Sequence, residues 1–424
     1  MSQGSGAKER LPRVLLILAI TLLACAIVIS RRPDAFTNGQ FYGEDGAVWF
    51  ADAYMRGPFA SLFLSYAQYF QLVTRLAPVV AAPFGIVHAP LIYNICGLLL
   101  QIAPVPYFLS RRFGSVVPSF WMRVLFSAVY LLMPSTELNV AISNAQFHLA
   151  ILATLVVVAP EPKRWHWITV DLLAVALCGL SGPFVYILFP VAVCCLLVRR
   201  KRFTGVLCAL VAVTLAAQVY ASTMSSRAHW GLGASLHNFL LIICNRVILA
   251  GLFGEEGGTH VFLRNFPDAT VLAGVICIVG LSVGVFAALR APWELRLFAL
   301  AAGGLVVAGL VNPLVLSSGH QWAIMAHSPG GERYFFMAQV AWVVTLLWAV
   351  SHLPRTWATR AIWAVVTMAF VSGLVIAWQY PPFANLNWPR EARMITTSAP
   401  GTKLVLPINP PGGGVVGAIR VTVK

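Results

Sequence analysis

Charged residues are scarce in this chain, and acidic residues are the scarcest. Asp, Glu, Lys and Arg make up 10% of the 424 residues, whereas hydrophobic residues make up 59% and the mean hydropathy is +0.80. Soluble domains carry about 25% charged residues, so this composition excludes an ordinary soluble domain. With 14 acidic and 29 basic residues, the formal net charge is +15. We expect the basic excess to set topology and to meet anionic lipid headgroups, so no nucleic-acid partner is needed.

Several sequence motifs are also missing. The chain contains no Cys-x-x-Cys pair and no Walker glycine pattern. Its one Gly-x-Ser-x-Gly, Gly280 to Gly284, lies inside a predicted span, and its one Gly-x-Gly-x-x-Gly, residues 412–417, precedes a short apolar run rather than a helix pattern. Neither has the strand-to-helix context that a serine hydrolase of that type or a dinucleotide-binding loop needs. The eight cysteines fall almost wholly inside apolar stretches, where they serve as small core residues rather than as disulfide partners. We find no internal repeat of the length used by solenoid proteins.

Apolar stretches dominate what is present. Each is roughly 15–20 residues long, near the length that crosses a bilayer, and the first resembles a signal anchor. We therefore predict an all-α polytopic membrane protein with about eleven transmembrane helices, over a domain of residues 1–380. The predicted spans are Val14–Ile29, Leu91–Leu109, Val117–Met133, Phe147–Ala159, Trp167–Leu180, Phe184–Val198, Phe203–Ala221, Thr270–Leu289, Leu297–Leu316, Tyr334–Ser351 and Ala361–Trp378.

Basic residues occupy every second connection between these spans. Because basic loops stay in the cytoplasm, the pattern predicts a cytoplasmic amino terminus and an extracytoplasmic first loop of residues 31–89. Arg31-Arg32 is an exception to this pattern, because this basic pair lies just past the first span and so on the predicted extracytoplasmic side. The stretch Leu72–Val87 must then not cross, and we predict a helix at the outer interface. The basic connections are Arg111-Arg112, Lys163-Arg164, Arg199 to Arg202, Arg290 with Arg296, and Arg355 with Arg360.

The last part of the chain changes character. Residues 381–424 are rich in proline and asparagine, and they contain two short apolar runs, Lys403–Ile408 and Val415–Val423. Such runs between turn residues predict strands. About forty residues cannot build an independent core, so we expect a small extracytoplasmic β appendage that rests on the membrane domain.

A pair of carboxylates in the first outer loop is the main candidate for chemistry. Glu44 and Asp45 stand between Gly43 and Gly46. Adjacent carboxylates raise each other's proton affinity, so that one can act as a base near neutral pH. The plainer alternative is that Asp45 caps a helix that begins at Gly46. The residues leave both interpretations open.

Other polar residues lie at predicted outer ends of spans. Arg333 follows two glycines and offers a fork of donors that suits a phosphate, although an interfacial arginine is the plainer alternative. Two histidines precede it, His320 and His327, and neither has a partner at metal-ligand spacing, so no metal site is predicted. Candidate substrate contacts are Glu137, Asn144, Gln146, His320 and His327.

These features together resemble the GT-C superfamily of integral membrane glycosyltransferases. Phe41-Tyr42-Gly43-Glu44-Asp45-Gly46 is similar to the acidic first-loop motif of that family, and Gly331-Glu332-Arg333-Tyr334-Phe335 to its late Arg-Tyr. The resemblance implies a GT-C-like fold with interfacial helices in the first outer loop and a polyprenyl-phosphate-sugar donor. It also implies a catalytic base at Asp45, or at Glu44, and a donor phosphate held by Arg333. Many members have Asp followed by Glu, which is the reverse of the order found here.

We therefore expect a transferase on the outer face of a bacterial inner membrane, acting on a lipid-linked or cell-surface glycan. No cofactor is called for by the pattern, although a divalent cation stays open. One alternative is a transporter or flippase for a lipid-linked saccharide, which should show repeat symmetry. Another is a polysaccharide polymerase or ligase, for which Arg227, Arg246 and Arg264 would supply the arginines.

Overall fold

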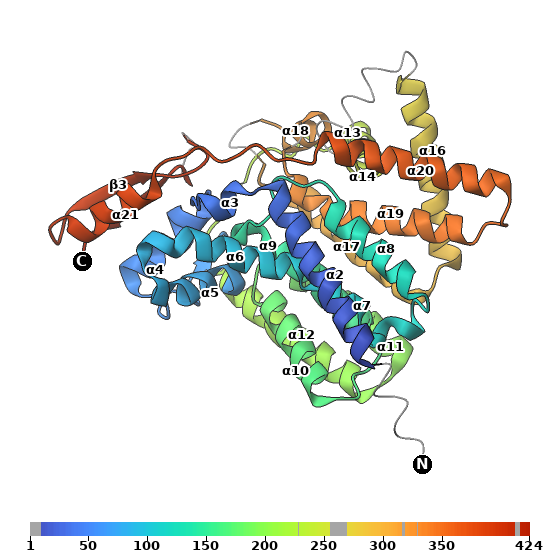
Figure 1. Cartoon of the computed structure of the whole chain (residues 1–424), viewed down its shortest axis with the longest axis horizontal. Helices are drawn as coiled ribbons and strands as arrows, with labels where there is room; N and C mark the ends of the chain where they lie inside the picture. The colour runs from blue at the N-terminus through green and yellow to red at the C-terminus, as the bar shows by residue number, and fades with distance from the viewer. Residues whose placement is uncertain (1–9, 228, 255–268, 316–318, 329, 412–415) are drawn as a thin grey trace.

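The computed structural model describes residues 10–227, 229–254, 269–315, 319–328, 330–411 and 416–424, and it is a helical bundle with one protruding arm (Figure 1). The helices of the bundle are α2 (Arg10–Arg31), α6 (Ala89–Ile102), α7 (Pro104–Leu109), α8 (Phe120–Leu132), α9 (Ala145–Val158), α10 (Trp165–Gly179), α11 (Phe184–Arg199), α12 (Arg202–Ser222), α16 (Ala269–Arg290), α17 (Trp293–Val311), α19 (Phe336–Ser351) and α20 (Trp357–Ile376).

Shorter elements connect and cover these helices. Between α2 and α6 lie α3 (Asp34–Thr37), the π-helical turn η1 (Asp45–Phe50), α4 (Ala51–Arg56), the hairpin β1 (Ser65–Tyr66) and β2 (Tyr69–Phe70), and α5 (Leu72–Ala81). Further along lie α13 (Leu236–Ile242), η6 (Ile243–Leu249), α14 (Ala250–Phe253), α18 (Gln321–His327) and η7 (Glu332–Tyr334). The arm holds α21 (Trp388–Thr397), β3 (Lys403–Pro407) and β4 (Ala418–Thr422).

The multi-pass helical character is confirmed. Within the described ranges, seven helical stretches are long and apolar enough to cross a bilayer, and six of them coincide with predicted spans. The other five predicted spans are the shorter helices α8, α9, α10, α11 and α19, of 13–16 residues. The seventh long stretch is Leu236–Phe253, which we did not predict as a span. The total of eleven stays a prediction.

Arg31 shows which helix ends lie together. It is 1% exposed, and its guanidinium donates to the carbonyls of Leu132 (3.3 Å), at the end of α8, and Ala377 (3.0 Å), just past α20. A cation at these positions satisfies free carbonyls and complements the helix dipoles. Helices α2, α8 and α20 therefore end on the same side of the bundle. We call this side the loop end, because the first loop, residues 31–89, lies there. Arg31, the exception to the pattern of basic loops, thus has a structural role at these helix ends.

Arginines also mark the opposite side, which we call the basic end. Arg123, in the first turn of α8, donates to the carbonyl of Leu109 at the end of α7 (3.2 Å). Arg112 and Arg199 donate to carbonyls at the end of α9, those of Pro160 (2.6 Å) and Val158 (2.6 Å). Successive helices of the bundle thus alternate in direction, as the basic residues in every second connection predict.

Two apolar helical segments do not run between these ends. At α5, the N–H of Leu72 donates to the carbonyl of Leu180 at the loop end (3.0 Å), and the chain returns there to begin α6. The α13–α14 segment starts beside α18 and finishes where Gly254 meets Pro134 and Gly373, also at the loop end. Neither segment therefore reaches the basic end, as the sequence predicted for Leu72–Val87.

The arm carries the predicted β appendage. Strand β3 pairs antiparallel with β4, and the sequence did not reveal helix α21 before them. The arm docks on the first loop through two backbone hydrogen bonds, from Gly43 to Asn409 (2.7 Å) and from Asn409 to Phe41 (3.2 Å). A second hydrophobic core forms at this junction, where apolar side chains of the loop meet Trp388 and Ile419. The appendage is therefore part of the wall around residues 41–50.

Candidate active site

Asp45 begins η1 and is buried, with 3% of its surface exposed. Ser143 donates its backbone N–H (3.1 Å) and its hydroxyl to the same carboxylate oxygen, Oδ1. The second oxygen accepts no hydrogen bond within the described part of the chain. Burial, and to a smaller extent the neighbouring charge of Glu44, raises the pKa of Asp45 to about 7, although the Ser143 hydrogen bonds oppose the shift.

The segment between α8 and α9 holds Ser143 in place. At Gly97 of α6 the segment approaches so closely that an added Cβ would lie 2.2 Å from the carbonyl oxygen of Val140. Gln101, one turn later, accepts the N–H of Val140 (3.0 Å), which has a positive φ of 63°. Glycine on α6 and this hydrogen bond therefore fix the path of the segment, and so the donors that face Asp45.

Arg333 and Glu137 form an ion pair at the same end of the bundle. One Glu137 oxygen accepts from Nη1 and from the backbone N–H of Arg333, both at 3.1 Å. The other terminal nitrogen of Arg333 donates to the carbonyl of Leu314 (2.6 Å). Burial lowers the pKa of Arg333, but Tyr334 and Glu137 outweigh it and the net shift is upward. The guanidinium is therefore held charged and oriented.

Glu332 is a buried carboxylate that we did not single out from the sequence. One of its oxygens accepts from the N–H (3.0 Å) and hydroxyl (3.0 Å) of Thr136 and from the N–H of Glu137 (3.2 Å). Burial and the charge of Glu137 raise its pKa to about 7. Glu332 thus fastens the α8–α9 segment to the start of α19.

The two groups of residues share one electrostatic environment. The charges of Glu137, Glu44 and Arg333 all act on the half-buried hydroxyl of Tyr42, whose pKa is raised mainly by burial. Glu44 also acts on both Asp45 and Arg333. Covalent continuity adds to this, because Asn144 follows Ser143 and donates to the carbonyl of Glu137 (2.8 Å). The fold therefore brings Glu44, Asp45, Glu137, Asn144 and Arg333 together.

The three remaining candidates for substrate contact, Gln146, His320 and His327, are not part of this group. Gln146 is on the first turn of α9, and its side-chain oxygen is buried without a hydrogen-bond partner among the described residues. His320 and His327 are exposed at the two ends of α18. Their side chains make no hydrogen bond within the described ranges. The structure thus joins neither histidine to Asp45 or Arg333.

Residues missed by sequence reasoning connect to Asp45 through Ser143. The indole N–H of Trp49 donates to the hydroxyl of Ser143 (2.9 Å), and the guanidinium of Arg75 lies over the Trp49 ring at 5.0 Å. Arg75 is 1% exposed and pairs with Asp52 (3.0 Å). Arg75 reaches Trp49 only because η1 packs on α5, which no local pattern predicts. A charged residue within the apolar run Leu72–Ala81 was the one available signal.

No metal centre is found among the described residues, where no three His, Cys, Asp or Glu side chains gather closely enough for a cation. Two of the arginines considered for a polymerase lie beside the group of residues around Arg333: the charge of Arg246 acts on Glu332, and the charge of Arg227 acts on Tyr334. Arg227 donates to the carbonyl of Asn312 (3.0 Å) and Arg246 to that of Ser328. Arg264 lies outside the described residues.

This arrangement combines a carboxyl group that titrates near neutral pH with a fixed guanidinium. The first can accept a proton from a hydroxyl group, and the second can bind a phosphate. Comparison with protein-family models, with curated proteins and with solved structures finds no match for this chain.

Proposed function

We propose that this chain is a GT-C-like integral membrane glycosyltransferase that moves a sugar from a polyprenyl-phosphate donor to a lipid-linked or cell-surface glycan. The observation that supports it best is that a buried carboxyl group, Asp45, and an anchored guanidinium, Arg333, lie at the same end of an apolar bundle. Buried ionisable groups in such a setting usually mark function.

Asp45 is the proposed base. Its Oδ1 is occupied by Ser143, so Oδ2 takes the proton from the acceptor hydroxyl. The acceptor oxygen then forms a bond to the anomeric carbon of the sugar, and the bond from that carbon to the phosphate oxygen breaks with its electron pair. Polyprenyl phosphate leaves. Glu44 keeps the proton affinity of Asp45 high, since its charge opposes ionisation of the neighbour.

Arg333 is the proposed phosphate ligand. Its contact with the Leu314 carbonyl holds one side of the guanidinium, while Glu137 occupies the other side as a counterion. A donor phosphate would exchange with Glu137 for the same N–H group, and the leaving phosphate would gain a charge-assisted bond. Glu137 and Asn144 would then be free to contact the sugar, with Gln146 further along α9. His320 and His327 stay candidates for contacts with the acceptor only.

The proposed location is a bacterial inner membrane, with a cytoplasmic amino terminus and with the loop end outside. The basic connections between helices support this orientation. The donor would then enter from the lipid beside the loop end.

The experiment is mass spectrometry of lipid-linked sugars and surface glycans in cells that lack the gene. These cells are complemented with wild type, with Asp45→Asn, or with Glu391→Gln as a control on α21. We expect the null and Asp45→Asn cells to lose one sugar from a glycan and to accumulate its lipid-linked donor. Glu391→Gln should restore the glycan, since the Glu391 carboxylate makes no hydrogen bond or ion pair with any residue that the structure describes.

Full restoration by Asp45→Asn, at normal protein abundance, would overturn the assignment of the base. Accumulation of a complete lipid-linked glycan on the cytoplasmic leaflet would instead support transport. Accumulation of unpolymerised repeat units would support the polymerase or ligase alternative.

A further inference from the structure

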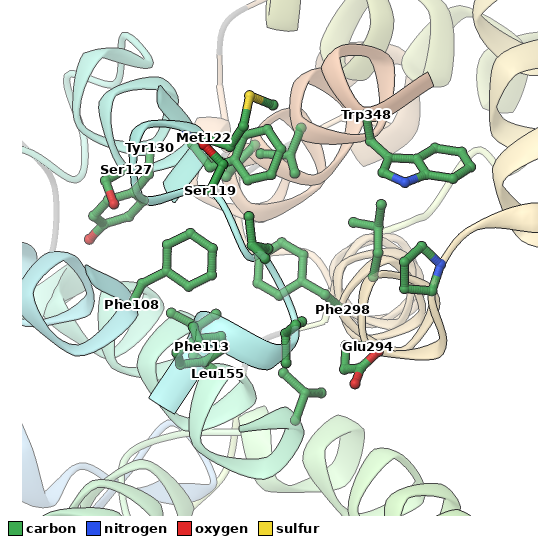
Figure 2. A pocket seen from close by; sticks show the side chains of 18 of the residues that line it. Phe108, Phe113, Ser119, Met122, Ser127, Tyr130, Leu155, Glu294, Phe298 and Trp348 are labelled. Atoms are coloured by element: carbon green, nitrogen blue, oxygen red, sulfur yellow. Dashed lines mark hydrogen bonds between the residues drawn. The ribbon is translucent and has the colours of Figure 1, made fainter. Parts of the chain in front are cut away.

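An apolar hollow in the described structure lies at the basic end, away from Glu44 and Asp45. Its volume is about 330 Å³, and it is bounded by α7, α8, α9, α17 and α19. Figure 2 shows aromatic side chains around it, among them Phe108 of α7, Phe298 of α17 and Phe113 of the connection between α7 and α8. Ligand pockets in proteins start at about 300 Å³ and are mostly apolar, so this one has the size and lining of a ligand site.

The hollow has the depth of one leaflet. Along α19 it extends from Val340 to Ser351, and along α8 from Tyr130 to Ser119. Eleven helical residues cover about 16 Å. Half of a bilayer's hydrocarbon core is about 15 Å thick. The hollow is thus deep enough to hold the part of a lipid acyl chain that spans one leaflet, if the chain enters at the basic end.

A second hollow adjoins the mouth of the first. It is lined by Arg290 and Arg296, and it shares Pro292, Trp348 and His352 with the apolar hollow. Trp348 therefore stands between an apolar compartment and a basic one. A single molecule with an apolar tail and an anionic head can occupy both.

The basic compartment has donors to offer. Arg290 is exposed, and its side chain makes no hydrogen bond with any described residue. Arg296 donates Nε to the carbonyl of Ala291 (2.7 Å), which leaves Nη2 without a partner in the described ranges. His352 holds its Nδ1 against the carbonyl of Trp348 (2.8 Å) and leaves Nε2 without a hydrogen bond there. Glu294 lines the apolar hollow only, so one carboxylate opposes two guanidinium groups.

We propose that this pair of hollows binds an anionic glycerophospholipid of the leaflet at the basic end. Its phosphate contacts Arg290 and Arg296, and one acyl chain passes Trp348 into the apolar hollow. The site is separate from the candidate active site, and it stands whether or not the chain transfers a sugar.

Trp348 supplies the test. Full-length protein is reconstituted in phosphatidylcholine vesicles with a small fraction of phosphatidylglycerol, and either lipid carries brominated acyl chains that quench tryptophan. The contribution of Trp348 is the fluorescence lost from wild type minus that lost from Trp348→Phe. We expect brominated phosphatidylglycerol to quench this residue far more strongly than brominated phosphatidylcholine does.

Two variants test separately the contact with the lipid phosphate and the contact with its acyl chain. Arg290→Gln, at an exposed position, should weaken the preference for phosphatidylglycerol about fivefold, the effect of one basic residue near a membrane surface. Val344→Phe fills the apolar hollow and should reduce quenching by both lipids. Arg355→Gln removes an exposed arginine from the same end that lines neither hollow, and it should change nothing.

Equal quenching by the two lipids in wild type would overturn the proposal, as would a full preference in Arg290→Gln. A small fraction of polyprenyl phosphate that abolishes the Trp348 signal, where unlabelled phosphatidylglycerol does not, would assign the hollow to a polyprenyl chain and also reject a phospholipid.

Discussion

The substitution Asp45→Asn should change the pH dependence of stability as well as activity. Asp45 is buried in the fold, and its pKa of about 7 stands well above the ordinary value of 3.8. Between these values the folded chain keeps a proton that the unfolded chain releases. The free energy of unfolding therefore falls as the pH rises from about 4 to about 7.

The size of the effect follows from the shift. About three pKa units, at 1.36 kcal/mol each, give a loss on the order of 4 kcal/mol, of which about 3 kcal/mol falls between pH 5 and pH 8. Asparagine cannot ionise, so the variant lacks this loss. Its amide nitrogen is left buried at a cost of about 1–3 kcal/mol, but this cost does not depend on pH.

The measurement is the thermal unfolding midpoint of the purified protein in mild detergent at pH 5 and pH 8. We expect the midpoint of Asp45→Asn, relative to wild type, to rise from pH 5 to pH 8. Asp52→Asn is the matched control on the following helix: it removes the partner of the buried Arg75, and it should lower the midpoint at both pH values. A gap between Asp45→Asn and wild type that stays constant over this range would refute the argument that burial raises the pKa of Asp45.

Other changes test the remaining parts of the site. Glu44→Gln should lower the pH at which transfer reaches half its maximum, since a charge that raises the pKa of Asp45 is lost; a pH profile of transfer measures it. Arg333→Lys should raise the donor concentration needed for half-maximal transfer without lowering abundance, because a point charge replaces a fork. Gly97→Ala should lower the unfolding midpoint, because its Cβ would lie 2.2 Å from the Val140 carbonyl oxygen. Arg31→Met should lower it too, by leaving carbonyls of α8 and α20 unpaired, with a loss of about 1–3 kcal/mol for each buried group.

Much of the architecture is local in origin and could be predicted. Long apolar runs become helices in any apolar environment, because their backbone must bond to itself. Basic residues between the runs indicate the alternation of directions, which the contacts of Arg123 and Arg199 match. The strands of the arm follow from proline and glycine around short apolar runs, and β3 and β4 confirm them. Glu44-Asp45 and Arg333 stood out because charge is scarce in this chain.

The rest depends on contacts between distant segments. Ser143 faces Asp45 across 98 positions of the chain, and Glu332 accepts from Thr136 across 196. No periodicity or propensity carries that information. Burial was likewise invisible: Asp45 reads as an exposed loop acid or a cap until the arm and α6 close over it. The amino-acid sequence by itself determined the class of the protein and the rare charges that could do chemistry. Only the tertiary structure decided which of those charges meet, because proton affinity and pairing depend on desolvation and distance, and both are set when segments far apart in the chain pack together.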